Sequence, residues 1–280
     1  MVKTIENEIK NIVKQAGKRN PKFREKYTKV LRRKRTDKFL KISKSNPVDE
    51  HTIIFDSFMG RNFSCSPKAI YKAMEKDHYF DSYSFIWVFR ADKADKYWEL
   101  LKDRRTSIVY YNSDEYYTAY ARSKYWITNS RLQAFLVNNG EHVYIQCWHG
   151  TPLKRLGHDL KLEYKNDMNT NEELEEKYDS DARRFTYMVS PSKFTSDKYR
   201  SCFDLENNNP GVRILEKGYP RNDYLFNYSE SDVKRIKETI GIDEHDNRKI
   251  ILYAPTWREN QHTIGVGYTY DIGTDFVKWQ

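Results

Sequence analysis

One histidine in this sequence lies where a base could act on a bound ligand. Residues 143–147 are typical of a short β-strand, and His149 follows directly. From Pro152 the residues favour a helix, with Thr151 as N-cap and proline at the first helical position. Ligands of α/β proteins bind at the carboxyl ends of the strands. His149 is therefore placed to accept a proton from a hydroxyl group.

The residues beside His149 favour an anionic ligand such as a phosphate. Backbone N–H groups at the start of the predicted helix attract anions, and Lys154 adds a positive charge. The alternative for His149 is an ordinary loop histidine with a satisfied hydrogen bond. Cys147 fits a small buried strand residue better than a nucleophile.

The surrounding elements alternate between strand and helix. Strands are predicted over 52–55, 83–89, 107–111, 125–128, 143–147, 187–189, 212–215 and 249–254, and helices over 66–76, 94–101, 113–122, 131–137, 192–203 and 229–240. Residues 172–181 form an acidic stretch that we expect to be a solvated helix face, and 241–248 a linker. Repeated β–α units of this length predict an α/β fold with a parallel sheet covered on both faces.

Several classes of protein lack support in the sequence. There is no GxGxxG, GxxxxGK[ST], HExxH or GxSxG motif. Cys65, Cys147 and Cys202 are widely spaced and odd in number, which predicts neither a disulfide framework nor a CxxC metal site. This cysteine usage favours a reducing cytoplasm. We expect no metal site, including at the acidic Asp179-Ser180-Asp181.

Basic charge is concentrated near the N-terminus. Residues 1–46 hold sixteen Lys and Arg against four Asp and Glu, whereas the remainder holds 33 against 36. An apolar stripe at helical spacing adds an amphipathic stretch, formed by Ile5, Ile9, Ile12 and Val13. We expect this segment to contact an anionic membrane surface. A solvated arm and a nucleic-acid tail are the alternatives, but no motif for specific nucleic-acid binding accompanies it.

No stretch of 18 consecutive apolar residues and no apolar signal-peptide core occurs in the sequence. With the basic N-terminal segment, this predicts a cytoplasmic protein that is peripheral on the inner face of the cell membrane.

The motif Trp148-His149-Gly150-Thr151-Pro152-Leu153-Lys154 resembles the signature of the CDP-glycerol glycerophosphotransferase family, which builds the polyol-phosphate chains of cell-wall teichoic acid. Gly157 and Asp159 follow at matching positions. Further segments resemble the family's motifs in the same order: 57–71, 85–88, 190–194, 218–223 and 251–258. Each motif alone has limited specificity, and the ordered set is specific.

The resemblance implies a GT-B fold, in which two Rossmann-like domains face each other across a cleft. We expect residues 1–46 to be a basic helical membrane-docking arm and 47–240 a Rossmann-like, acceptor-side domain with a complete parallel sheet. Residues 241–280 would only begin the nucleotide-donor domain. Because family members continue well beyond this point, we expect a fragment or a truncated product that is inactive by itself.

The implied reaction transfers glycerol phosphate, or ribitol phosphate, from a CDP-polyol to a hydroxyl of a lipid-linked teichoic acid chain and releases CMP. His149 would be the base, and the residues implied to bind donor phosphates are Gly150, Thr151, Lys154, Arg221, Thr256 and Arg258. For Arg221 and Arg258 a structural ion pair remains open. No cofactor is implied. The alternatives are an inactive remnant that only docks to a membrane or partner, and a GT-B capsule glycosyltransferase that uses a sugar nucleotide.

Overall fold

The computed structural model describes residues 21–161 and 170–243, together with 245–246, 248–254, 262–263 and 267–268. The chain divides into two compact units, Met1–Asn227 and Tyr228–Gln280. The amphipathic stripe predicted within residues 1–20 lies outside the described residues. No helix in the described part of the chain is both long and apolar enough to cross a membrane.

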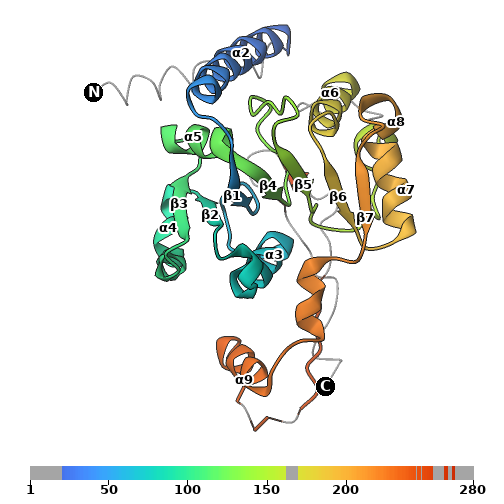
Figure 1. Cartoon of the computed structure of the whole chain (residues 1–280). Coiled ribbons are helices and arrows are strands. Elements are labelled where there is room, and N and C mark those ends of the chain that lie inside the picture. The colour runs from blue at the N-terminus through green and yellow to red at the C-terminus, as the bar shows by residue number, and fades with distance from the viewer. Residues whose placement is uncertain are drawn as a thin grey trace. The chain divides into compact units, whose positions relative to one another are not determined.

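Seven parallel strands form the sheet of the first unit (Figure 1). Their spatial order is β3-β2-β1-β4-β5-β6-β7, and their bounds are Asp49–Asp56 (β1), Ser84–Phe89 (β2), Thr106–Tyr110 (β3), Ser123–Thr128 (β4), Val143–Gln146 (β5), Tyr187–Ser190 (β6) and Arg213–Glu216 (β7). The strand order reverses between β1 and β4. Such a switch point opens a crevice at the carboxyl ends of the strands, where ligands of α/β proteins bind.

Helices cover both faces of this sheet, which confirms the predicted α/β fold (Figure 1). The α-helices of the first unit are α2 (Pro21–Ser45), α3 (Cys65–Lys76), α4 (Ala91–Ala94), α5 (Asp114–Arg122), α6 (Asn171–Ala182), α7 (Lys193–Cys202) and α8 (Leu205–Asn208). The 3₁₀ segments in the described part of this unit are η1 (His78–Phe80), η2 (Asp95–Lys102), η3 (Gly157–Asp159) and η4 (Pro220–Leu225). The predicted N-cap of α3 is two residues late, because Ser64 and not Ser66 precedes the helix.

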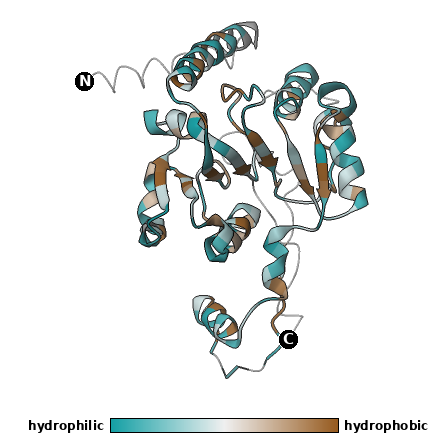
Figure 2. Ribbon diagram, viewed as in Figure 1, coloured by the Kyte–Doolittle hydropathy of each residue, from teal (hydrophilic) through white to brown (hydrophobic). Residues whose placement is uncertain are grey.

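The core of the first unit is rich in aromatic side chains. On one face of the sheet, Phe39 of α2 and Tyr120 of α5 pack in the same cluster as Trp126 of β4. On the other face, Tyr71 of α3 packs with Trp87 of β2. Hydrophobic residues gather along the strands, while the outer sides of the helices are hydrophilic (Figure 2). This rigid layer fixes where each strand ends and therefore where the loops begin.

The helix predicted over 131–137 is wrong. The buried guanidinium of Arg184 donates to the backbone carbonyls of Leu132, Gln133 and Leu136, at 2.8–3.3 Å. The Leu132 and Leu136 carbonyls are therefore satisfied by a side chain and not by helical N–H groups. The Gln133 carbonyl also accepts the Leu136 N–H at 3.0 Å, in a turn that does not continue as a helix. Leu132 and Leu136 are still buried in the core. The spacing of these apolar residues therefore indicates burial, but in an irregular segment and not in a helix.

The second unit begins with α9 (Glu230–Thr239), whose N-cap Ser229 accepts the backbone N–H of Asp232 at 3.2 Å. A two-residue pair, β8 (His262–Thr263) and β9 (Gly267–Tyr268), is antiparallel. The predicted buried strand over 249–254 is wrong: Leu252 is 86% exposed, and no strand is formed there. A strand is stable only when neighbouring strands and a packed face support it, and the described residues of this unit supply neither to 249–254.

Candidate active site

Loops that follow β1, β4, β5 and β7 come together at the carboxyl edge of the sheet. Phe58 follows β1, Asn129 follows β4, His149 follows β5 and Arg221 lies in η4 after β7. The site predicted from the sequence took residues from the β5 loop, from the loop after β7 through Arg221, and from 256–258, but none from the loops after β1 and β4. The structure joins the β5 loop to the other three through hydrogen bonds and ring contacts.

His149 is held by its Nδ1 atom and exposed to solvent. Nδ1 lies 2.8 Å from the backbone carbonyl oxygen of Asn129. A carbonyl can only accept, so Nδ1 carries the hydrogen and the lone pair of the neutral ring is on Nε2. The imidazole stacks on Trp148, with ring centres 4.7 Å apart, and lies 6.0 Å from the ring of Phe58. The arrangement leaves one oriented, basic nitrogen.

Trp148 anchors this loop in the core. Its side chain is only 5% exposed and packs edge-to-face against Phe203 at 5.3 Å. Its backbone adopts a left-handed φ of 48°, and its N–H donates to the side-chain oxygen of Gln146 at 2.9 Å. This buried anchor turns the chain sharply after β5, so that His149 faces outward at the sheet edge.

The helix predicted to start at Pro152 does not form. The chain after His149 is irregular up to η3, and Thr151 accepts the Leu153 N–H at 2.8 Å through its carbonyl. Gly157 adopts a left-handed φ of 47°, which ends any helix within five residues, and so short a helix gains too little from propagation to offset its nucleation. Thr151 is thus no N-cap, and the predicted helix terminus for a phosphate is absent.

Thr151 and Arg221 are instead connected through Tyr219. The Thr151 hydroxyl lies 3.2 Å from the Tyr219 hydroxyl, and the Arg221 guanidinium carbon lies 4.2 Å from the centre of the Tyr219 ring. Arg221 also donates to the sulfur of Cys65 at 3.2 Å, at the first residue of α3. The loop that carries His149, the segment after β7 and the start of α3 therefore meet here.

Arg221 brings a half-buried positive charge to this place. Among the described residues, no carboxylate forms an ion pair with it; its contacts are the Tyr219 ring and the Cys65 sulfur. The alternative of a structural ion pair therefore has no support for Arg221. Lys154 is exposed in the loop after His149. Thr256 and Arg258 lie outside the described residues.

Gly150 leaves open space next to His149. A Cβ atom built at Gly150 would meet no heavy atom within 4 Å. Neither packing nor a positive φ requires glycine at this position. The missing side chain keeps the approach to His149 clear, which suits a ligand that has to come close to the backbone.

Two polar residues at this edge were not predicted from the sequence. Asp56 ends β1 and is buried; it accepts the Gly60 N–H at 2.8 Å and the Tyr120 hydroxyl at 3.3 Å. Burial raises the pKa of Asp56 to about 6, against the lowering effect of these hydrogen bonds. Asn129 is fully buried after β4. The available signal was a polar residue directly after an apolar strand, which is common in loops and therefore weak.

Cys147 is fully buried, and burial raises the pKa of its thiol well above the usual range. This confirms the interpretation of Cys147 as a small strand-end residue. No group of three or more His, Cys, Asp or Glu within the described ranges could hold a metal ion.

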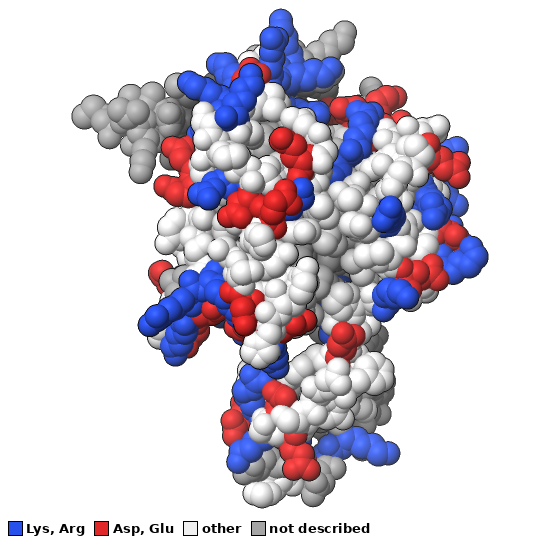
Figure 3. Space-filling view, viewed as in Figure 1, with Lys and Arg blue, Asp and Glu red and all other residues white. Residues whose placement is uncertain are grey.

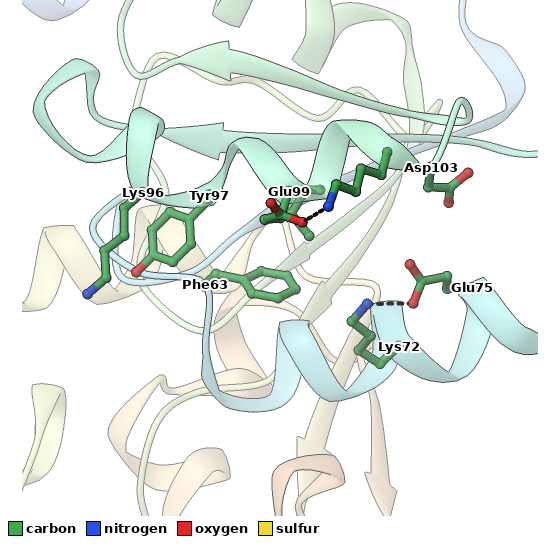
Figure 4. Close-up of a pocket in the computed structure, with 9 residues that line it drawn as sticks. Phe63, Lys72, Glu75, Lys96, Tyr97, Glu99 and Asp103 are labelled. Atoms are coloured by element: carbon green, nitrogen blue, oxygen red, sulfur yellow. Dashed lines mark hydrogen bonds and ion pairs between the residues drawn. The ribbon is translucent and has the colours of Figure 1, made fainter. Parts of the chain in front are cut away.

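A separate pocket of about 350 Å³ lies between α3 and η2 (Figure 4). It is lined by Phe63, Lys72, Glu75, Lys96, Tyr97, Glu99, Leu100, Lys102 and Asp103. Its charges are largely paired: Lys72 bonds Glu75 at 2.6 Å, and Lys102 bonds Glu99. None of the predicted site residues lines it, so His149 and its neighbours, not this pocket, form the candidate active site.

The family model of CDP-glycerol:poly(glycerophosphate) glycerophosphotransferases matches residues 38–280. The chain belongs to this family. A teichoic acid poly(glycerol phosphate) polymerase of Staphylococcus epidermidis is 35% identical over 249 residues, which cover 88% of this chain and 33% of that protein. A teichoic acid glycerol-phosphate transferase of Staphylococcus aureus is 29% identical, covering 81% of this chain and 55% of that protein.

Solved structures of the wall teichoic acid polymerase TagF agree with the fold. A histidine-to-asparagine variant soaked with CDPG superposes with a TM-score of 0.69 at 32% identity, covering 89% of this chain and 58% of that one. The chain spans between 29% and 55% of the length of the curated relatives it matches. The α/β fold described above is thus shared with solved members of the family.

Proposed function

We propose that this chain takes part in transferring glycerol phosphate, or a related polyol phosphate, from a CDP-polyol to the terminal hydroxyl of a lipid-linked teichoic acid chain. The observation that carries the proposal is the hydrogen bond from His149 Nδ1 to Asn129, which leaves Nε2 as a free base at the sheet edge. Family membership supplies the donor class. CDP-glycerol is the donor that the family name indicates.

In the proposed reaction, the acceptor hydroxyl attacks the β-phosphorus of the donor. A new phosphorus–oxygen bond forms, the bond from that phosphorus to the oxygen of the CMP group breaks, and CMP leaves. Nε2 of His149 takes the hydroxyl proton. Phosphoryl transfer of this kind depends mainly on positioning and charge stabilisation, and general base catalysis contributes about 10²–10⁴-fold.

Arg221 is the proposed phosphate clamp of the first unit. A guanidinium without a carboxylate partner can bind two phosphate oxygens in a bidentate manner. Its position beside Tyr219 and Thr151 puts the charge next to the loop that carries His149. We assign supporting phosphate contacts to Gly150, Thr151 and Lys154, and to Thr256 and Arg258 outside the described residues.

A chimera tests this function. Residues 38–280 would replace the matching segment of the Staphylococcus epidermidis polymerase, and CMP release from CDP-glycerol would be measured with a lipid-linked acceptor. His149→Ala should lower turnover by roughly 10²–10⁴-fold with a smaller change in donor binding. His158→Ala is the matched control, because the His158 ring bonds Asp179 at 2.6 Å and not a strand-end loop.

Normal turnover by the His149→Ala chimera would refute the role of His149. Release of a nucleotide from a UDP- or GDP-sugar, with none from CDP-glycerol, would favour the glycosyltransferase alternative.

We also propose that α2 binds an anionic membrane surface and so brings the site to a lipid-linked acceptor on the inner face of the cell membrane. Arg32, Arg35 and Lys38 point toward the first unit, where they bond Glu176, Asn112 and Asp114. A second set, Lys26, Arg33, Lys41 and Lys44, is exposed. Lys and Arg gather over α2 in Figure 3. The first set fixes the helix, and the second offers its charge to lipid headgroups.

A further inference from the structure

Asn129 connects the loop after β1 to the loop after β5. Its side-chain oxygen accepts the Phe58 N–H at 2.8 Å, and its backbone oxygen accepts His149 Nδ1–H at 2.8 Å. Its amide nitrogen also lies 3.5 Å from the Ser57 hydroxyl. Asn129 follows β4, next to β1 at the switch point of the sheet. One buried residue thus touches both walls of the site.

The loop that Asn129 holds is conformationally costly. Phe58, Met59 and Gly60 adopt successive left-handed φ values of 52°, 56° and 72°. The left-handed conformation is unfavourable for non-glycine residues, so it persists only where neighbours fix it. Asp56 holds one end through the Gly60 N–H, and Asn129 holds the other through the Phe58 N–H.

We propose that Asn129 is a positioning residue for His149. The bond from the Phe58 N–H to the Asn129 side chain fixes both the Phe58 loop and the backbone of Asn129. The Asn129 carbonyl then keeps the hydrogen of His149 on Nδ1 and the lone pair on Nε2. Phe58 adds a ring contact to the imidazole at 6.0 Å. This inference rests on the proposed function only for the role of His149 as the base. The tautomer of His149 follows from the hydrogen bond to Asn129 alone.

The groups that face His149 make this a sharp prediction. Its contacts within the described residues are the Asn129 carbonyl and the rings of Trp148 and Phe58, none of which carries a charge. The Asn129 carbonyl is its only hydrogen-bond partner among those residues. If that carbonyl moves, no other described residue forms a hydrogen bond that would select one tautomer over the other.

The test is nitrogen NMR of the full chain labelled with ¹⁵N-histidine, with His149→Gln used to assign the His149 signal. The unmodified chain should show His149 as the Nδ1–H tautomer. Asn129→Ala should abolish that preference. Asn129→Asp, which keeps an acceptor for the Phe58 N–H, should retain it. Asn138→Ala is the matched control, because the Asn138 amide binds the carbonyls of His142 and Arg184 away from His149.

An Nε2–H tautomer in the unmodified chain would overturn the proposal, as would an unchanged Nδ1–H tautomer in folded Asn129→Ala. If the alanine variant does not fold, Asn129→Asp decides, because loss of the Nδ1–H tautomer there contradicts the proposed role of the Phe58 bond. In the active chimera, Asn129→Ala should lower kcat far more than it changes KM. The tautomer is read without substrate, so an inactive chimera would count against the proposed function and not against this inference.

Discussion

At the scale of single residues, the proposed site combines an oriented imidazole with open space beside it. His149 owes its orientation to a carbonyl on a neighbouring strand end. Gly150 next to it contributes by having no side chain. Chemistry and access are therefore set by different residues, and they can be altered separately.

Two glycine substitutions in the same segment should have opposite consequences. Gly150→Ala meets no atom within 4 Å, so the folded state should keep its stability within about 0.5 kcal/mol, as for other surface substitutions. Gly157→Ala would bring a Cβ to 2.1 Å from the Cys202 carbonyl oxygen at a left-handed φ, so it should destabilise the fold severely. Chemical denaturation of both variants gives the comparison.

The same pair separates access from folding. In the chimera, Gly150→Ala should reduce CMP release although the protein is fully folded, because the added methyl group occupies the approach to His149. Full activity of Gly150→Ala would mean that the ligand enters from another side.

Asp56 should make stability depend on pH in an unusual direction. Its folded-state pKa is about 6, above the ordinary value of 3.8, because of burial. The folded protein therefore binds this proton more tightly than the unfolded chain. The contribution of the protonated Asp56 carboxyl to folding stability is fully present below pH 3.8 and is lost as pH rises through about 6. One pKa unit corresponds to about 1.4 kcal/mol, so the loss is about 3 kcal/mol at most.

Asp56→Asn isolates this contribution, because asparagine keeps an acceptor for the Gly60 N–H and does not ionise. Denaturant unfolding of both proteins should be measured between pH 4 and pH 7.5. As pH rises, the free energy of unfolding of the unmodified protein should fall relative to that of the variant. A constant difference across this range would mean that Asp56 titrates alike in the folded and unfolded states.

The sequence indicated His149, and the structure gives it the predicted place at a strand end. Arg221 was predicted from a motif, but that no carboxylate among the described residues pairs with it depends on the packing of η4 against α3. Asn129 and Asp56 were missed. Asn129 bonds Phe58 and His149, which lie 71 and 20 positions away in the sequence. Asp56 bonds Tyr120, which lies 64 positions away. No local sequence pattern encodes contacts over such separations.

At the scale of elements, local signals worked where the helix termini are made by neighbouring residues. Ser113, Ser192 and Ser229 each accept a backbone N–H in the first turn of the helix that follows. The strands of the first unit also appear close to their predicted positions, because runs of β-branched and aromatic residues fit a buried sheet. The helix predicted over 131–137 failed where a buried guanidinium binds the backbone carbonyls, and the helix predicted after Pro152 failed because Gly157 ends it within five residues.

Arg184 provides the test of that explanation. It lies 7% exposed, bonds Asp181, and satisfies three carbonyls of the segment that failed to become a helix. Arg184→Met should leave the Leu132 and Leu136 carbonyls without the guanidinium that they bind, and, among the described residues, the Asp181 carboxylate with only the longer contact to Arg131 at 3.6 Å. Removing one member of a buried ion pair costs about 3–5 kcal/mol, and this loss should appear in denaturant unfolding.

The neighbouring Arg183 is the matched control for Arg184. Arg183 is more than half exposed and pairs with Asp179 at 3.7 Å, so Arg183→Met should cost at most about 1 kcal/mol. Equal effects of the two substitutions would contradict the proposed stabilising role of Arg184.

The expectation that the acidic stretch is a solvated helix face needs a correction at Asp181, because the carboxylate of this residue is buried in α6.

At the scale of the whole molecule, the basic N-terminal region is partly built into the fold. Phe39 of α2 is 1% exposed and belongs to the core cluster of the first unit. Deleting residues 1–46 would therefore remove core packing together with basic charge, and lost membrane binding in such a deletion would have two explanations. Surface substitutions on α2 separate them.

Replacing the exposed set Lys26, Arg33, Lys41 and Lys44 by Gln should weaken binding to anionic vesicles without loss of folding. Each basic residue near an anionic surface contributes about 1 kcal/mol, so four substitutions should lower the partition coefficient by roughly 100–1000-fold.

A control variant with Gln at Lys76, Lys96, Lys198 and Lys217, which are exposed elsewhere in the first unit, changes the net charge equally and should bind almost normally. Because exposed charges are screened over about 8 Å at physiological ionic strength, added salt should weaken the unmodified chain's binding. Equal losses in the two variants would show that net charge alone drives binding, and α2 would then have no special role at the membrane.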